Sequence, residues 1–156
     1  MLKEEGGNFT KKKFIASAFK TFNLNISTLT DRIAFQKTIY LMQNLGSGTR
    51  FKFVWHNFGP FSSEVATIGQ FLTENEIQRA ELLTCQAAKD FSVLKRGKER
   101  DTKFLEMMSD IVFLGKNQGI HEESKLFGEL IRHRSYLDDK ELFNLSIQRL
   151  KSFNLI

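Results

Sequence analysis

The chain has 156 residues, of which 41% are hydrophobic and 26% charged, a size and composition typical of one soluble globular domain. Its single cysteine excludes an intrachain disulfide, and no apolar run approaches the length of a membrane span. The net charge of +5 is compatible with a nucleic acid or an acidic protein as partner. The start of the chain has no signal-peptide pattern, so we expect a cytoplasmic protein with no membrane association.

Phenylalanine is the unusual component, with 16 residues against one tryptophan and two tyrosines. We expect most of these rings to pack in the core. The alternative is a partner-binding surface on which several rings are exposed.

The first ten residues are predicted to be a flexible lead-in, because they contain Gly6 and Gly7 and few apolar side chains. Residues 11–23 then repeat apolar side chains at spacings of three and four, which predicts an amphipathic helix. Its first turn carries basic side chains that oppose the helix dipole, namely Lys11, Lys12 and Lys13. We interpret them as a solvated helix end, and a phosphate-binding patch is the alternative.

Residues 29–44 predict a second helix, with Thr28 or Thr30 as the N-cap and Gly46 as the stop. Apolar side chains lie nearly all round this helix, which indicates burial on several sides.

Lys37 is the exception within that helix, next to Gln36. Its stem could lie along apolar surface while the ammonium reaches water. Alternatively, the ammonium is buried and paired with a backbone carbonyl or with a carboxylate such as that of Glu64.

Residues 51–56 alternate between apolar and polar positions, which predicts a half-buried strand with Trp55 on its inner face. A corner follows at Gly59 and Pro60, where proline has a fixed φ. Residues 62–72 predict a helix capped by Ser62.

The next segment is ambiguous. Thr73 and Glu76 match a capping box, so residues 74–95 could form helix. Equally, residues 81–86 and 91–96 could be two short strands of a β-wing. Residues 95–103 are an exposed basic loop that would be the tip of such a wing, with Lys95, Arg96, Lys98 and Arg100 as candidate phosphate contacts.

Helical periodicity returns over residues 103–114, 121–134 and 138–153, with Asp138 predicted to cap the last helix. The expected fold is therefore mainly α with a small β component (α+β). We expect a compact single domain over residues 11–156, and the sequence also allows a winged-helix-like arrangement.

The sequence offers no recognisable catalytic or metal site. Its three histidines are far apart and in no ligand-type spacing, and neither a phosphate loop nor a nucleophile elbow is present. Cys85 is expected to be a buried free thiol. We therefore predict no cofactor and no enzymatic activity. Tyr40, Trp55 and Phe58 could line a groove around Lys37, although a core role for these rings is favoured.

One arrangement of residues is more specific. Phe35, Gln36 and Lys37 precede Tyr40 on the helix, and Trp55 precedes Phe58-Gly59-Pro60-Phe61, then Glu64 and Val65. This pattern, over about residues 29–72, resembles the Panacea or SocA-like family and the related uncharacterised YwgA-like family.

The resemblance implies a protein-binding role. Members of the Panacea-like family include antitoxins that neutralise a cognate toxin, and one branch acts as an adaptor that delivers a toxin to a protease. It marks Gln36, Lys37, Tyr40, Trp55, Gly59, Pro60 and Glu64 as motif residues that could shape a groove.

Three hypotheses of function follow. The first is a non-enzymatic protein-interaction module, antitoxin-like or adaptor-like, that binds a protein partner such as a cognate toxin. The second is a winged-helix nucleic-acid-binding regulator, although its recognition helix, residues 62–72, would contain no Arg or Lys. The third is a structural subunit of a larger defence or toxin assembly. The sequence leaves the oligomeric state open.

Overall fold

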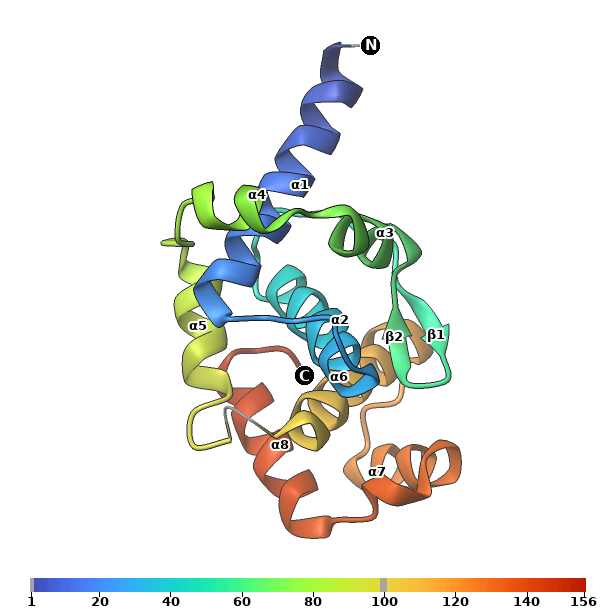
Figure 1. The fold of residues 1–156 in the computed structure, drawn as a ribbon. Helices are drawn as coiled ribbons and strands as arrows, with labels where there is room; N and C mark the ends of the chain where they lie inside the picture. Colours follow the sequence, from blue (N-terminus) through green and yellow to red (C-terminus); the bar gives the residue numbers. More distant parts are fainter. Residues whose placement is uncertain (1, 99–100) are drawn as a thin grey trace.

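The computed structural model describes the backbone of residues 2–98 and 101–156, and the side chains from Thr10 onward outside that gap. This part of the chain forms eight α-helices, a short 3₁₀ helix and a two-stranded sheet (Figure 1), which confirms a mainly α fold with a small β component. The elements are α1 Leu2–Phe22, α2 Leu29–Asn44, β1 Val54–His56, β2 Gly59–Phe61, α3 Ser63–Phe71, α4 Glu74–Arg79, α5 Gln86–Leu94, α6 Thr102–Gln118, α7 Glu123–His133, η1 Ser135–Leu137 and α8 Lys140–Ser152.

The helices α2 and α6 form the centre of the molecule and pack against each other. Eight consecutive residues of α2, from Phe35 to Met42, are buried, which confirms the prediction from its all-round apolar pattern. A capping box between Thr28 and Asp31 starts α2, and Gly46 follows its end with a φ of +96°. In α6, every residue from Phe104 to Gly115 is buried.

Two hydrophobic clusters share α2. The larger one joins α2 to α5, α6, α7 and α8, and the smaller one joins α2 to α1, α3 and the segment before β1. Phenylalanine is mostly a core residue, as predicted, although Phe71 at the end of α3 is 70% exposed.

The hairpin β1–β2 packs across both central helices, since β2 contacts α2 and α6. Trp55 pairs with Pro60 in the antiparallel register. The predicted alternation over residues 51–56 is present, because Phe51, Phe53 and Trp55 are less exposed than the residues between them. The Gly-Pro corner differs from the prediction, since these residues form the second strand of a hairpin.

Residues 74–94 form the two helices α4 and α5, so the β-wing prediction is wrong. Thr73 and Glu76 make the capping box that starts α4. In α5, Ala87, Ala88, Phe91 and Leu94 form a buried helical face, whose spacing of three and four residues explains why this segment is not a strand. Within the described residues, the basic loop after α5 therefore does not connect two strands.

Three smaller predictions are also corrected. The first helix starts at Leu2 rather than near residue 11. Asp139, not Asp138, is the N-cap of α8, because its side chain accepts the backbone N–H of Leu142. Cys85 precedes α5 as its N-cap residue, a position that leaves the thiol exposed rather than buried.

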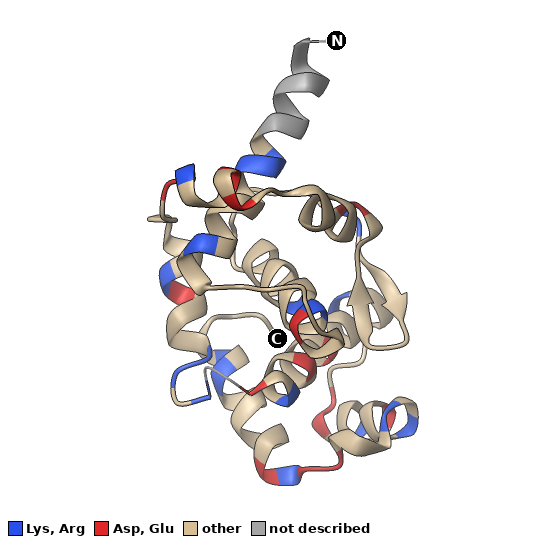
Figure 2. Ribbon diagram, in the orientation of Figure 1, with Lys and Arg blue, Asp and Glu red and all other residues tan. Residues whose placement is uncertain are grey.

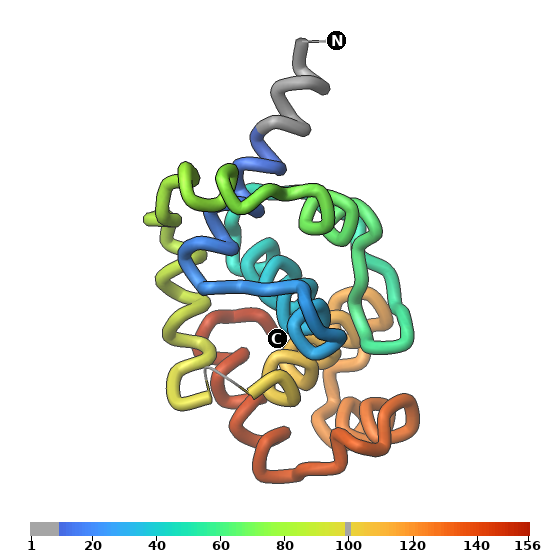
Figure 3. Tube along the Cα trace, in the orientation of Figure 1, coloured from blue at the N-terminus to red at the C-terminus, as the bar shows by residue number. Residues whose placement is uncertain are grey.

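The course of the chain brings α3 and α4 next to α1, which both helices contact (Figure 3). The segment from Asn23 to Thr28 crosses between α1 and α2. None of the helices in the described ranges is both long and apolar enough to span a membrane.

Candidate functional site

The hairpin is fastened to α2 by two adjacent side chains, Gln36 and Lys37. Gln36 donates a hydrogen bond to the backbone oxygen of Ser62 (2.9 Å) and accepts one from the Ser62 backbone N–H (3.0 Å). The Lys37 ammonium donates to the backbone oxygen of Pro60 at 2.7 Å. These bonds hold the residues on either side of Phe61, so α2 sets the position at which α3 begins.

Lys37 is buried, with 2% of its surface exposed. Of the two sequence interpretations, the buried ammonium paired with a backbone carbonyl is therefore the one observed. The suggested pairing with Glu64 is wrong. Burial, supported by repulsion from Arg134 and opposed by Glu106, lowers the pKa of Lys37 to about 7.

Behind the hairpin lies a buried charge cluster, which consists of Lys37, Glu106, Asp110 and Arg134. Arg134 forms an ion pair with Asp110. Glu106 accepts a hydrogen bond of 2.6 Å from the hydroxyl of Tyr136. With two positive and two negative side chains the cluster can be neutral, which reduces the cost of burying each charge.

Gly59 is the point at which the hairpin meets this cluster. Its φ is +87°, a conformation that side chains with a Cβ rarely adopt. A Cβ at this position would overlap Oδ1 of Asp110 and lie 2.9 Å from Nη2 of Arg134. Only glycine therefore allows the hairpin to close over the Asp110–Arg134 pair.

On the other side of the same hairpin is an open pocket of about 540 Å³, between the start of α2, the hairpin and α3. This volume is within the usual range for ligand sites. The lining is mostly apolar and consists of Ile26, Leu29, Arg32, Ile33, Phe35, Gln36, Lys37, His56, Phe58, Gly59, Phe61, Ala66 and Gln70. We call it the hairpin pocket.

The structure brings Gln36, Lys37 and Gly59 to this pocket, and Pro60 supplies the carbonyl that holds Lys37. The rings of Tyr40 and Trp55 lie elsewhere. Both pack on Phe113 of α6, with ring centroids 6.3 Å and 5.5 Å away respectively.

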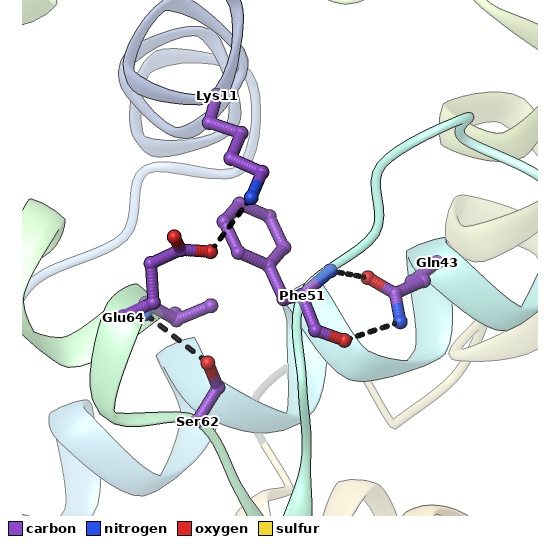
Figure 4. Close-up of polar contacts among 6 residues, drawn as sticks. Lys11, Gln43, Phe51, Ser62 and Glu64 are labelled. Carbon is purple, nitrogen blue, oxygen red and sulfur yellow. Dashed lines mark hydrogen bonds and ion pairs between the residues drawn. The ribbon is translucent and has the colours of Figure 1, made fainter. Parts of the chain in front are cut away.

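Glu64 faces the first helix instead. Its carboxylate lies 2.9 Å from the Lys11 ammonium, which is also 5.3 Å from the centroid of the Phe51 ring (Figure 4). Gln43 holds the backbone of Phe51 with two hydrogen bonds, to the N–H at 2.7 Å and to the oxygen at 3.0 Å. This contact joins α1 to α3.

The basic residues considered for nucleic-acid contacts are dispersed over the molecule (Figure 2). Lys11 pairs with Glu64, and Lys12 pairs with Glu76 at 2.6 Å, so these two do not form a solvated helix end. Lys13 is exposed on the same helix.

The second basic group, around the end of α5, is some way along the chain from the first. Lys95 lies over the rings of Phe22 and Phe91, at 4.8 Å and 4.9 Å. Arg96 and Lys98 are exposed, whereas Arg100 lies outside the described residues.

The cluster was missed at the sequence stage, although α6 contains a signal. Glu106 and Asp110 are four residues apart, hence on one side of the helix, within an otherwise apolar run. Their partners, Lys37 and Arg134, are distant in sequence and no local pattern connects them.

Among the described residues, no group of three or more His, Cys, Asp or Glu side chains is placed to hold a metal ion. Comparison of the chain with protein-family models, curated proteins and solved structures gives no match. The geometry of the hairpin pocket and of the cluster behind it is therefore the basis for considering function.

Proposed function

We propose that this protein is a cytoplasmic, non-enzymatic interaction module that binds a protein partner through the hairpin pocket. The observation that carries the proposal is an open, mainly apolar pocket whose amide and ammonium groups are already bonded within the chain. Such a pocket suits an apolar side chain of a partner, which needs volume and few hydrogen bonds.

The polar groups at the pocket support binding rather than catalysis. Gln36 uses both its amide oxygen and its amide nitrogen to hold Ser62, and Lys37 is bonded to Pro60. These groups support the pocket wall. A general base or nucleophile would instead need to reach a bound substrate.

The resemblance of residues 29–72 to the Panacea or SocA-like family supports an antitoxin-like or adaptor-like role, in which the partner is a cognate toxin. Gln36, Lys37 and Gly59 belong to that motif and also line the pocket. On this proposal the motif preserves the shape of the binding surface.

The test uses two substitutions on α3. Ala66 lines the pocket, whereas its neighbour Thr67 is exposed and does not. The tagged protein is recovered from its own cells, its stoichiometric partner is identified, and binding is measured with purified proteins. We expect Ala66→Trp to weaken binding at least about tenfold, the effect of losing one central contact, and Thr67→Trp to leave it unchanged.

Equal binding by both variants, or recovery without any stoichiometric partner, would overturn the proposal. Thermal melts of both variants show whether Ala66→Trp remains folded. If that variant unfolds, Leu29→Glu replaces it, with Thr30→Glu as the matched control in the same helical turn. Leu29 lies at the pocket and is 50% exposed, so a polar replacement there is compatible with folding.

The nucleic-acid hypothesis has its own test. A regulator should retain duplex DNA at low salt and lose it when Lys95, Arg96, Lys98 and Arg100 are replaced by alanine. Absence of retention at low salt would dismiss that alternative. The third hypothesis, a subunit of a larger assembly, predicts that the recovered complex contains more than one partner species.

A further inference from the structure

The ionisable side chains around the hairpin pocket are all of one kind. Arg32, Lys37 and His56 line it, and none of its described lining residues is acidic. Arg32 comes from α2 and His56 from β1, and both are exposed. Two separate elements therefore place basic groups at an otherwise apolar pocket.

The neighbouring carboxylates are directed to other groups. Asp31, which precedes Arg32, accepts the backbone N–H of Thr28 at 3.2 Å in the capping box. Glu64 of α3 pairs with Lys11. Neither carboxylate is paired with Arg32, whose hydrogen bond is to the backbone oxygen of Ile26 at 3.3 Å.

The first turn of α2 adds to this field. Leu29, Arg32 and Ile33 lie in the first turns of a 16-residue helix, and all three line the pocket. The N-terminal end of a helix carries a partial positive charge. The net charge of the whole chain, +5, has the same sign.

We propose that the hairpin pocket binds an acidic, apolar segment of the protein partner. A bulky apolar side chain of that segment enters the pocket between Phe35, Phe58 and Phe61, and a carboxylate next to it in sequence lies against Arg32 and His56. The argument for this occupant is charge complementarity, since a basic pocket favours an acidic segment and repels a basic one. This inference rests on the proposed function and specifies the chemistry of the partner at the same site.

The experiment selects the occupant without knowing it in advance. A phage-displayed library of random 12-residue peptides is panned on the full-length protein, with the Ala66→Trp variant used to remove clones that bind elsewhere. We expect the enriched peptides to share a bulky apolar residue with Asp or Glu within two positions. Enrichment of peptides without an acidic bias, enrichment of basic peptides, or no enrichment would each overturn the inference.

A charge reversal then tests the contact itself. Arg32→Glu should weaken a selected peptide at least about fivefold at low salt, and a peptide with Asp and Glu changed to Lys should regain binding to that variant. Arg50→Glu makes the same charge change at an exposed residue outside the pocket lining and should have little effect. Equal losses in the two variants would indicate only a response to net charge and would contradict the assigned contact.

The two proposals fail in different ways. If the natural partner loses affinity in Ala66→Trp but not in Arg32→Glu, the protein-binding function stands and the acidic occupant is wrong. If the natural partner binds Ala66→Trp normally, the hairpin pocket is not the binding site and both proposals fail.

Discussion

Replacement of Gly59 by alanine tests whether the hairpin depends on the buried charge cluster. Two effects combine at this position. The positive φ costs an alanine about 1–2 kcal/mol. In addition, the new Cβ would overlap the Asp110 carboxylate and approach Arg134, and breaking a buried ion pair costs about 3–5 kcal/mol.

Gly48 provides the matched control. Its φ is +85°, and a Cβ there would meet nothing within 4 Å, so Gly48→Ala carries the backbone cost alone. We expect Gly59→Ala to lower the free energy of unfolding by about 3 kcal/mol more than Gly48→Ala. In a domain of this size that difference corresponds to roughly 6–12 °C in Tm.

Equilibrium unfolding in urea, followed by far-UV circular dichroism, measures both variants. A difference between them below about 1 kcal/mol would refute the close approach of Gly59 to the Asp110–Arg134 pair. A double-mutant cycle supplies the second measurement, since Gly59→Ala should cost much less in an Asp110→Ala background, where the overlapping carboxylate is gone. Additive losses would contradict the proposed contact.

Two further predictions concern Lys37 and Cys85. Burial lowers the pKa of Lys37 from 10.5 to about 7, so between these values the unfolded chain holds a proton that the folded chain lacks. Stability should therefore gain up to about 1.4 kcal/mol per pH unit from this group as pH rises from about 7. Urea melts of Lys37→Met should lack that gain, and parallel pH profiles of the variant and the parent would refute the burial of a titrating ammonium. Cys85 is exposed and should react with a thiol reagent in the folded protein at nearly the rate found in denaturant, whereas strong protection of the native thiol would contradict its position.

The sequence predicted the central part of this fold because its signals there are local. The capping box at Thr28, the all-round apolar pattern of α2 and the alternation over residues 51–56 each depend on residues close together in the chain. Each of these signals corresponds directly to a backbone conformation.

The segment from residue 74 to residue 94 lacks such clarity. The helices α4 and α5 have six and nine residues, lengths at which a helical and a strand pattern are hard to distinguish. What decides between them is packing, since Ala87, Ala88, Phe91 and Leu94 bury one helical face against the core. That tertiary contact is not readable from the segment itself.

The candidate site shows the same division at the level of single residues. Gln36, Lys37 and Gly59 were recognised from the sequence, and the resemblance added the proline corner. Glu106, Asp110 and Arg134 were not, because their relation to Lys37 exists only after the hairpin has folded over α2 and α6. The pocket likewise depends on the meeting of three elements.

The hairpin separates the buried charge cluster from the pocket, and this placement constrains how the two can influence each other. Lys37 and Gly59 belong to both sides, since each lines the pocket and each touches the cluster or its carbonyl anchor. The Lys37 ammonium is already bonded to Pro60, so its most direct contribution to a partner is to hold the pocket wall in place. Arg32 and His56, which are exposed at the pocket, are then the groups that would meet the partner's charge. A substitution in the cluster should therefore change stability and binding together, whereas a substitution at Arg32 should change binding alone.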